Sequence, residues 1–239
     1  DWERAIELVK SLDDVLINSQ KTLPLLAQYY CEISDIYNKQ NQTEKAIAIS
    51  KKALKTNPEC IRANYQLAKY YSRNDIRISV QYYYSIILQN KIFGKYIVSK
   101  IISLAKELRN NAIILKTLAA ISKTKNMSFI PDIYFFLLYE QDEETAMQYI
   151  NSFDRGDLIN NFIITHTLAS TEDQANSDNI VHELVNSYKN IFSSYYYFIC
   201  NNCGYKSNKL NWICPSCNTW ETITPKSAVD IIEDGGPSE

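Results

Sequence analysis

The chain has 239 residues, of which 46% are hydrophobic, so it is long enough to bury a sizeable core. Its 25 Lys and Arg nearly balance its 27 Asp and Glu, which excludes the strongly basic character typical of nucleic-acid-binding domains. Five Gly and six Pro are few for a β fold with many turns, and no apolar run reaches the roughly 18 residues of a membrane span. We therefore expect an all-α chain without a transmembrane helix.

Residues 27–94 contain two consecutive units of 34 residues in the register of the tetratricopeptide repeat. Small or apolar residues fall where the two antiparallel helices of such a repeat pack together: Tyr37, Ala46, Ala53 and Leu54, then Ala68, Tyr71, Val80, Tyr84 and Leu88. Upstream, DWERAIELVKSL matches the second helix of a repeat once an insertion is allowed. A solenoid needs capped ends, so we expect further repeats or an anchor before residue 1.

Further amphipathic helices are expected as far as residue 194, which predicts a solenoid over residues 1–194. Stacked helix pairs form a concave groove lined by the first helix of each unit. The positions that face this groove in the two clear repeats are Gln28, Cys31, Asp35, Arg62, Tyr65 and Lys69. They form no Lys and Asn clamp for a C-terminal carboxylate, so the sequence does not name the ligand of the groove.

Four cysteines dominate the segment CNNCGYKSNKLNWICPSC, with the spacing Cys200-x2-Cys203-x10-Cys214-x2-Cys217. Two such turns supply four thiolates in a tetrahedron, the geometry that Zn prefers and Fe accepts. Gly204 follows the first pair, where a positive φ is often required, and a short hairpin is expected between the two pairs. Residues 195–226 are too few to fold alone, so metal binding would supply their folding free energy.

Other uses of these cysteines fit less well. Disulfides are disfavoured because no secretory signal precedes them, and a redox pair needs a single CxxC at the start of a helix. Cys31 and Cys60 are isolated within the predicted repeats and are interpreted as small packed thiols. The sequence contains no Ser-His-Asp set, P-loop or Gly-rich dinucleotide turn, so no catalytic residue is assigned.

Tetratricopeptide repeats followed by FICNNCGYKSNKLNWICPSCNTWETITP resemble the lipopolysaccharide assembly protein B family of Gram-negative bacteria. The resemblance covers essentially the whole chain and includes the DWERAIE and YYCEI stretches. Its most specific part is CxxCGY, a Trp, CPSCxxW and T-I-x-P, which place Tyr205, Trp212, Trp220 and Pro225 around the cysteines.

The resemblance implies a tetratricopeptide superhelix with a rubredoxin-like zinc-ribbon module over residues 195–226. The tail over residues 227–239 does not resemble the family and is expected to be flexible and acidic. It implies a non-enzymatic adaptor at the cytoplasmic face of the inner membrane, anchored by an N-terminal transmembrane helix that this chain does not include. The implied partners are the membrane-bound AAA+ zinc protease, the lipid A pathway deacetylase that it degrades, and other inner-membrane lipopolysaccharide proteins. A homodimer is a further expectation, and nucleic acid is not an expected partner.

The ribbon departs from electron-transfer rubredoxins in its ten-residue gap and in Asn218, which replaces their usual Gly. We expect Tyr205, Trp212 and Trp220 to pack against the last helices of the solenoid, near residues 179–194, so that metal loss disorders this end. The main alternative is a generic repeat scaffold whose zinc ribbon binds nucleic acid through Lys206 and Lys209. An electron-transfer protein is the third hypothesis.

Overall fold

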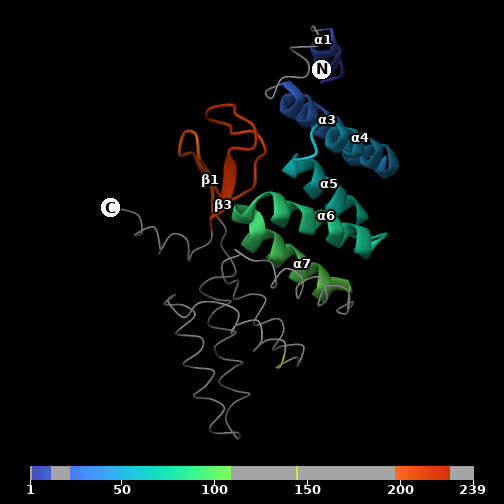
Figure 1. Cartoon of the computed structure of the whole chain (residues 1–239), viewed down its shortest axis with the longest axis vertical. Coiled ribbons are helices and arrows are strands. Elements are labelled where there is room, and N and C mark those ends of the chain that lie inside the picture. The colour runs from blue at the N-terminus through green and yellow to red at the C-terminus, as the bar shows by residue number, and fades with distance from the viewer. Residues whose placement is uncertain (1, 12–21, 109–143, 145–196, 227–239) are drawn as a thin grey trace, which may run out of the picture. The chain divides into compact units, whose positions relative to one another are not determined.

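The computed structural model describes residues 2–11, 22–108, 144 and 197–226 (Figure 1). Its helices are α1 (Trp2–Lys10), α3 (Thr22–Lys39), α4 (Thr43–Thr56), α5 (Ile61–Tyr71), α6 (Ile76–Gln89), the 3-10 turn η1 (Lys91–Phe93) and α7 (Gly94–Leu108). Its strands are β1 (Tyr197–Cys200), β2 (Lys206–Ser207) and β3 (Ile223–Lys226). The predicted helical class with a small cysteine-rich strand region is confirmed. Within these residues no helix has the length and apolarity that crossing a bilayer requires.

Helices α3 and α4, and then α5 and α6, form two successive pairs, although α3 begins at Thr22 rather than at residue 27, where the first predicted 34-residue unit starts. Asn41, with φ of 59°, makes the left-handed turn between α3 and α4, a conformation that Asn tolerates better than most residues. The Asp75 carboxylate begins α6 by accepting hydrogen bonds from the backbone of Arg77 and Ile78. The two helix pairs lie in the region of the predicted repeats, while the assignment to tetratricopeptide repeats stays a prediction.

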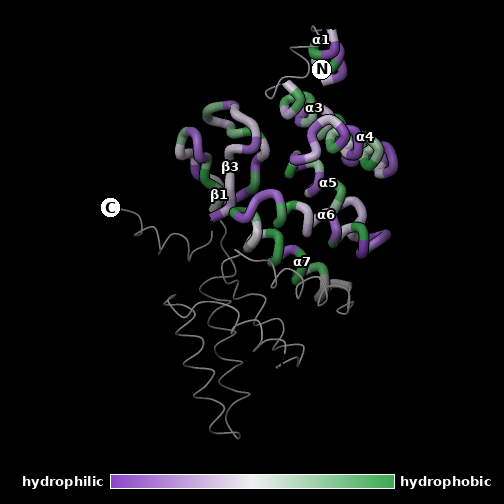
Figure 2. Tube along the Cα trace, viewed as in Figure 1, coloured by the Kyte–Doolittle hydropathy of each residue, from purple (hydrophilic) through white to green (hydrophobic). Residues whose placement is uncertain are grey.

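Small side chains allow these helices to approach closely. One fully buried cluster between α3, α4 and α5 consists of Ala27, Cys31, Ala53, Cys60 and Ala63. Hydrophobic residues recur along the helices and alternate with polar ones (Figure 2), as the amphipathic pattern predicts. Buried serines add polar ties, because the Ser34 hydroxyl lies 2.7 Å from that of Ser50 and donates to the Ala46 carbonyl.

The chain divides into two compact units. The first comprises residues 1–93, 199–206 and 210–224, so it holds α1 to η1 together with most of the cysteine-rich segment. The second comprises residues 94–198, 207–209 and 225–239, and in its described part the Tyr96 ring of α7 meets the Phe198 ring edge-on at 5.5 Å. The predicted boundaries at residues 194 and 226 stay predictions, and the helices expected over 110–194 lie outside the described residues apart from Glu144.

The cysteine-rich segment, called the ribbon below (residues 197–226), contains a three-stranded sheet in the order β2-β1-β3. Strand β1 pairs with β2 across the first cysteine pair, and Ile213 forms an antiparallel bridge with Trp220 across the second. The expected hairpin between the two pairs is therefore wrong. Instead, each CxxC turn is the loop of a small hairpin, because backbone hydrogen bonds join Cys200 to Tyr205 and Cys214 to Thr219.

Candidate metal centre

The two CxxC turns share one backbone design. The Cys200 carbonyl accepts from Gly204 N at 2.8 Å while its N–H donates to the Tyr205 carbonyl at 2.8 Å. The same two bonds recur at Cys214, with Asn218 N at 2.9 Å and the Thr219 carbonyl at 2.9 Å. Both turns thus end four residues after their first cysteine.

The residue that closes each turn has a positive φ. Gly204 has φ of 75°, as the sequence predicts, and Asn218 has φ of 54° at the equivalent place in the second turn. Asn is one of the few residues that visit this left-handed region readily. The departure from the usual Gly therefore preserves the geometry of the turn.

The turns bring four thiol groups together. The sulfur atoms of Cys200, Cys203, Cys214 and Cys217 all lie within 4.8 Å of one another. Each turn contributes one buried first cysteine and one more accessible second cysteine. Sulfur atoms pair across the turns, with Cys200 3.7 Å from Cys217 and Cys203 3.6 Å from Cys214.

These separations fit a metal ion at the centre of the four sulfurs. A tetrahedral ion with metal–sulfur bonds of about 2.3 Å separates its ligand atoms by about 3.8 Å. Four thiolates form a closed site that leaves no position for substrate, which is typical of a structural metal. The donor set accepts either Zn or Fe, so the predicted single metal ion is confirmed at that level.

Hydrogen bonds within the turns favour thiolates at two of the ligands. Bonds from Asn202 and Thr219 lower the pKa of Cys217 to about 5. A hydrogen bond with Thr222 lowers the pKa of Cys200, while burial raises the pKa of Cys214 to about 11. Cys217 is therefore ready to bind a cation at neutral pH, whereas Cys214 must lose its proton to the incoming metal.

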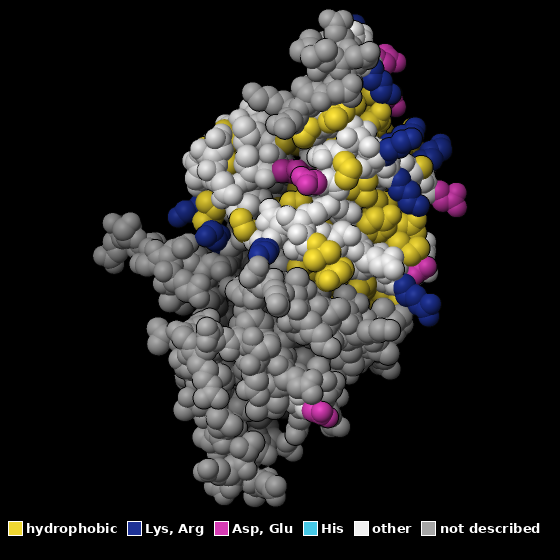
Figure 3. Space-filling view, in the orientation of Figure 1, with side chains coloured by type: hydrophobic (Ala, Val, Ile, Leu, Met, Phe, Trp, Pro, Cys, Tyr) yellow, Lys and Arg dark blue, Asp and Glu magenta, His cyan; other side chains and the backbone are white. Residues whose placement is uncertain are grey.

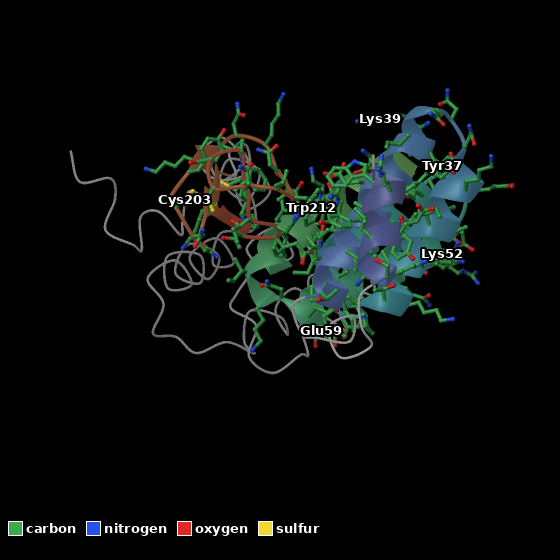
Figure 4. All side chains as sticks on the ribbon, turned by 90° about the horizontal axis from the view of Figure 1, so that it is seen from above. Tyr37, Lys39, Lys52, Glu59, Cys203 and Trp212 are labelled. Carbon is green, nitrogen blue, oxygen red and sulfur yellow. The ribbon has the colours of Figure 1, made fainter. Side chains whose placement is uncertain are left out.

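Trp212 joins the ribbon to the helices. Its ring stacks on Phe93 of η1 with centroids 6.3 Å apart and packs against Tyr65 of α5 at 5.6 Å. Tyr65 in turn meets Tyr83 of α6 edge-on at 6.0 Å. Figure 4 shows Trp212 on the helix side of the ribbon and Cys203 farther from the helices. Two elements of the first unit, η1 and α5, thus contact one ribbon side chain.

Trp220 makes a second junction with the helices. The Arg62 guanidinium lies over its ring at 5.6 Å, and Trp2 of α1 meets it edge-on at 6.2 Å. Arg62 is only 3% exposed, and its Nη2 is held by Glu32 at 2.8 Å and Asp35 at 2.7 Å. These carboxylates fix the guanidinium plane against the indole.

Glu221 follows Trp220 and caps helix α5. Its Oε1 accepts a hydrogen bond from Arg62 N at 3.2 Å, in the first turn of α5, where Cys60 supplies no side-chain cap. A carboxylate at this end of a helix is stabilised by the unpaired N–H groups and the helix dipole. Glu221 has φ of 52°, a backbone conformation that is uncommon for Glu.

The structure locates every side chain predicted to pack or to line the groove. Gln28 and Arg62 are buried, Asp35 pairs with Arg62, and Lys69 is exposed. At Arg62 and Tyr65 the neighbour is the ribbon of the chain itself. A role of these residues in partner binding stays a prediction.

The aromatic residues of the ribbon have neighbours that the sequence did not indicate, while their expected packing against residues 179–194 stays a prediction. In the described residues Trp212 and Trp220 contact α1, α5 and η1, whereas residues 179–194 lie outside them. Tyr205 is 36% exposed. The sequence did not indicate Glu221, because its partner Arg62 is 159 residues away and a single Glu carries no motif.

The comparison with known proteins covers both the ribbon and the whole chain. Residues 198–225 match a family model described as the rubredoxin metal binding domain. The chain is also 26% identical over 234 residues to "Lipopolysaccharide assembly protein B" of Haemophilus influenzae, covering 95% of this chain and 58% of that relative. The resemblance to the lipopolysaccharide assembly protein B family is confirmed. The chain spans less than two thirds of the length of that relative.

Proposed function

We propose that this chain is a non-enzymatic adaptor in lipopolysaccharide assembly, which promotes proteolysis of the lipid A pathway deacetylase by a membrane-bound AAA+ protease. The proposal is supported chiefly by the similarity to a lipopolysaccharide assembly protein along 95% of the chain. The closed four-cysteine site fits this role, because a metal without an open position stabilises structure rather than performing catalysis.

The contacts of the ribbon suggest how the metal would serve an adaptor. Trp212, Trp220 and Glu221 lie beside or beyond the second CxxC turn, and all three contact helices of the first unit. The antiparallel bridge between Ile213 and Trp220 joins the backbone on the two sides of that turn. Metal binding would therefore fix the ribbon surface that packs on α5, and the partner would recognise helices and ribbon together.

The surface gives little support to the nucleic-acid alternative. In Figure 3 the Lys and Arg side chains lie mainly toward the edges of the described part, with Asp and Glu among them. The exposed face of α4 carries Lys45, Lys51, Lys52 and Lys55, yet two of these already lie over Tyr rings. Aromatic residues interleaved with a continuous basic track would be needed for binding a single strand.

Affinity capture from membranes of the source organism tests the proposal. The protein is tagged in its full natural length and compared with Cys214→Ser, which removes a ligand, and Ser216→Ala, a matched change at an exposed position of the same turn. We expect the protease or the deacetylase to be recovered with the wild type and Ser216→Ala only. Equal recovery with Cys214→Ser would refute the role of the metal, and recovery of nucleic acid in place of both partners would refute the adaptor.

A further inference from the structure

A second pair of thiols lies outside the ribbon site. Cys31 of α3 and Cys60, the residue before α5, are both fully buried, and their sulfur atoms are 3.9 Å apart. This separation is close to the 3.6 Å and 3.7 Å between paired sulfurs of the ribbon. It also matches the roughly 3.8 Å expected between two thiolates on one tetrahedral metal ion.

Two oxygen-bearing side chains approach the same thiols. Glu221 Oε1 of the ribbon lies 3.7 Å from Cys60 Sγ. Gln28 is 2% exposed, its Nε2 lies 3.5 Å from Cys60 Sγ, and its Oε1 has no hydrogen-bond partner among the described residues. A buried acceptor without a partner is destabilising, so the unpaired Gln28 oxygen indicates a place for a ligand. Rotation about its last side-chain bond would turn this oxygen towards the thiols.

We propose that Cys31, Cys60 and Glu221, completed by the Gln28 amide oxygen, form a second site for a thiophilic divalent cation such as Zn²⁺. Two sulfurs, a carboxylate and one neutral oxygen are donors that Zn²⁺ accepts in fourfold coordination. The four ribbon cysteines are the one group among the described residues whose donor atoms are already all within 4.8 Å. The second site therefore closes only as Glu221 moves towards Cys31.

The site would link the two parts of the first unit. Cys31 and Cys60 belong to the helical region and Glu221 belongs to the ribbon, so one ion would join them where Glu221 caps α5. Burial and the neighbouring Cys60 raise the pKa of Cys31 well above its ordinary value, and a bound cation would remove that proton. This inference does not depend on the identity of the adaptor's partners.

Metal stoichiometry of the purified full-length protein tests the site. The reduced protein is equilibrated with Zn²⁺, passed through gel filtration and analysed for Zn per chain by elemental mass spectrometry. We expect two Zn per chain in the wild type and one in Cys60→Ser. Glu221→Gln should weaken the second equivalent at least tenfold in competition with a chelator, while the ribbon equivalent is retained.

Substitution of Co²⁺ gives an independent signature. The absorption spectrum would contain the thiolate-to-Co²⁺ charge-transfer band of the four-cysteine ribbon site and a further contribution from the two thiolates of the second site. The Cys60→Ser variant would lose only the contribution of the second site. One equivalent in the wild type, or a second equivalent unaffected by Cys60→Ser, would overturn the proposal. A disulfide between Cys31 and Cys60 in the protein from cells would overturn it too, because no thiolates would then be free to bind.

Discussion

We expect docking of the ribbon on the helices to depend on Trp212, and the variant Trp212→Ala tests this. Its ring makes two aromatic contacts, stacked on Phe93 at 6.3 Å and tilted against Tyr65 at 5.6 Å. Each such pair contributes about 0.5–1.5 kcal/mol beyond buried area, so the two together give roughly 1–3 kcal/mol. Truncating a fully buried Trp costs about 3–5 kcal/mol, and the half-buried Trp212 should lose about 2–4 kcal/mol.

The next residue provides a matched control. Ile213 is 37% exposed, so Ile213→Ala should change the free energy of unfolding by only about 0.5 kcal/mol. Both variants are unfolded with urea in their Zn-loaded form and followed by the circular dichroism of the helices, which does not depend on the removed fluorophore. If Trp212→Ala costs no more than Ile213→Ala, the ring contacts do not hold the ribbon to α5 and η1, and the docking argument fails.

Three further outcomes are expected from the second CxxC turn and its surroundings. Asn218→Val should destabilise the Zn-loaded protein by about 1–2 kcal/mol in urea unfolding, whereas Asn218→Gly should not, because only the latter suits φ of 54°. Glu221→Ala should cost about 1 kcal/mol by removing the cap of α5, and amide exchange at the start of α5 should rise. The pKa of Cys214 is about 11 without metal, so Zn²⁺ binding must release at least one proton near pH 7. The Zn²⁺ affinity measured by chelator competition should therefore rise about tenfold per pH unit for each proton released. An affinity that does not change between pH 6 and 8 would contradict this.

The sequence predicted the metal ligands and the turn at Gly204 because both are local. Cysteine spacing determines how two residues of one turn point, and the need for a positive φ follows from the same few residues. Asn218 could be identified only as a departure from a pattern. Its φ of 54° shows that it repeats the backbone of Gly204.

The contacts between ribbon and helices were not predictable in the same way. Glu221 caps a helix that begins at Ile61, and Trp220 meets Trp2 almost at the opposite end of the chain. No periodicity or motif relates residues so far apart. The proximity of Cys31 and Cys60 was not predicted either, because the two cysteines are isolated in the sequence. Their sulfur atoms come together only through the packing of α3 beside α5.

The placement of these contacts gives the metal more than a local role. A ribbon of about thirty residues buries too little apolar surface to fold alone, so its shape depends on the metal. Trp220 and Glu221 follow the second CxxC turn within four residues, and they meet the Arg62 side chain and the first turn of α5. Arg62 is in turn held by Glu32 and Asp35 of α3. Loss of the metal would therefore free the start of α5 and the Arg62 cluster, while the buried cluster between α3, α4 and α5 contains no residue of the described ribbon. A partner that binds α3 and α5 at this junction would therefore respond to metal binding in the ribbon, although neither helix supplies a ligand to the ribbon metal.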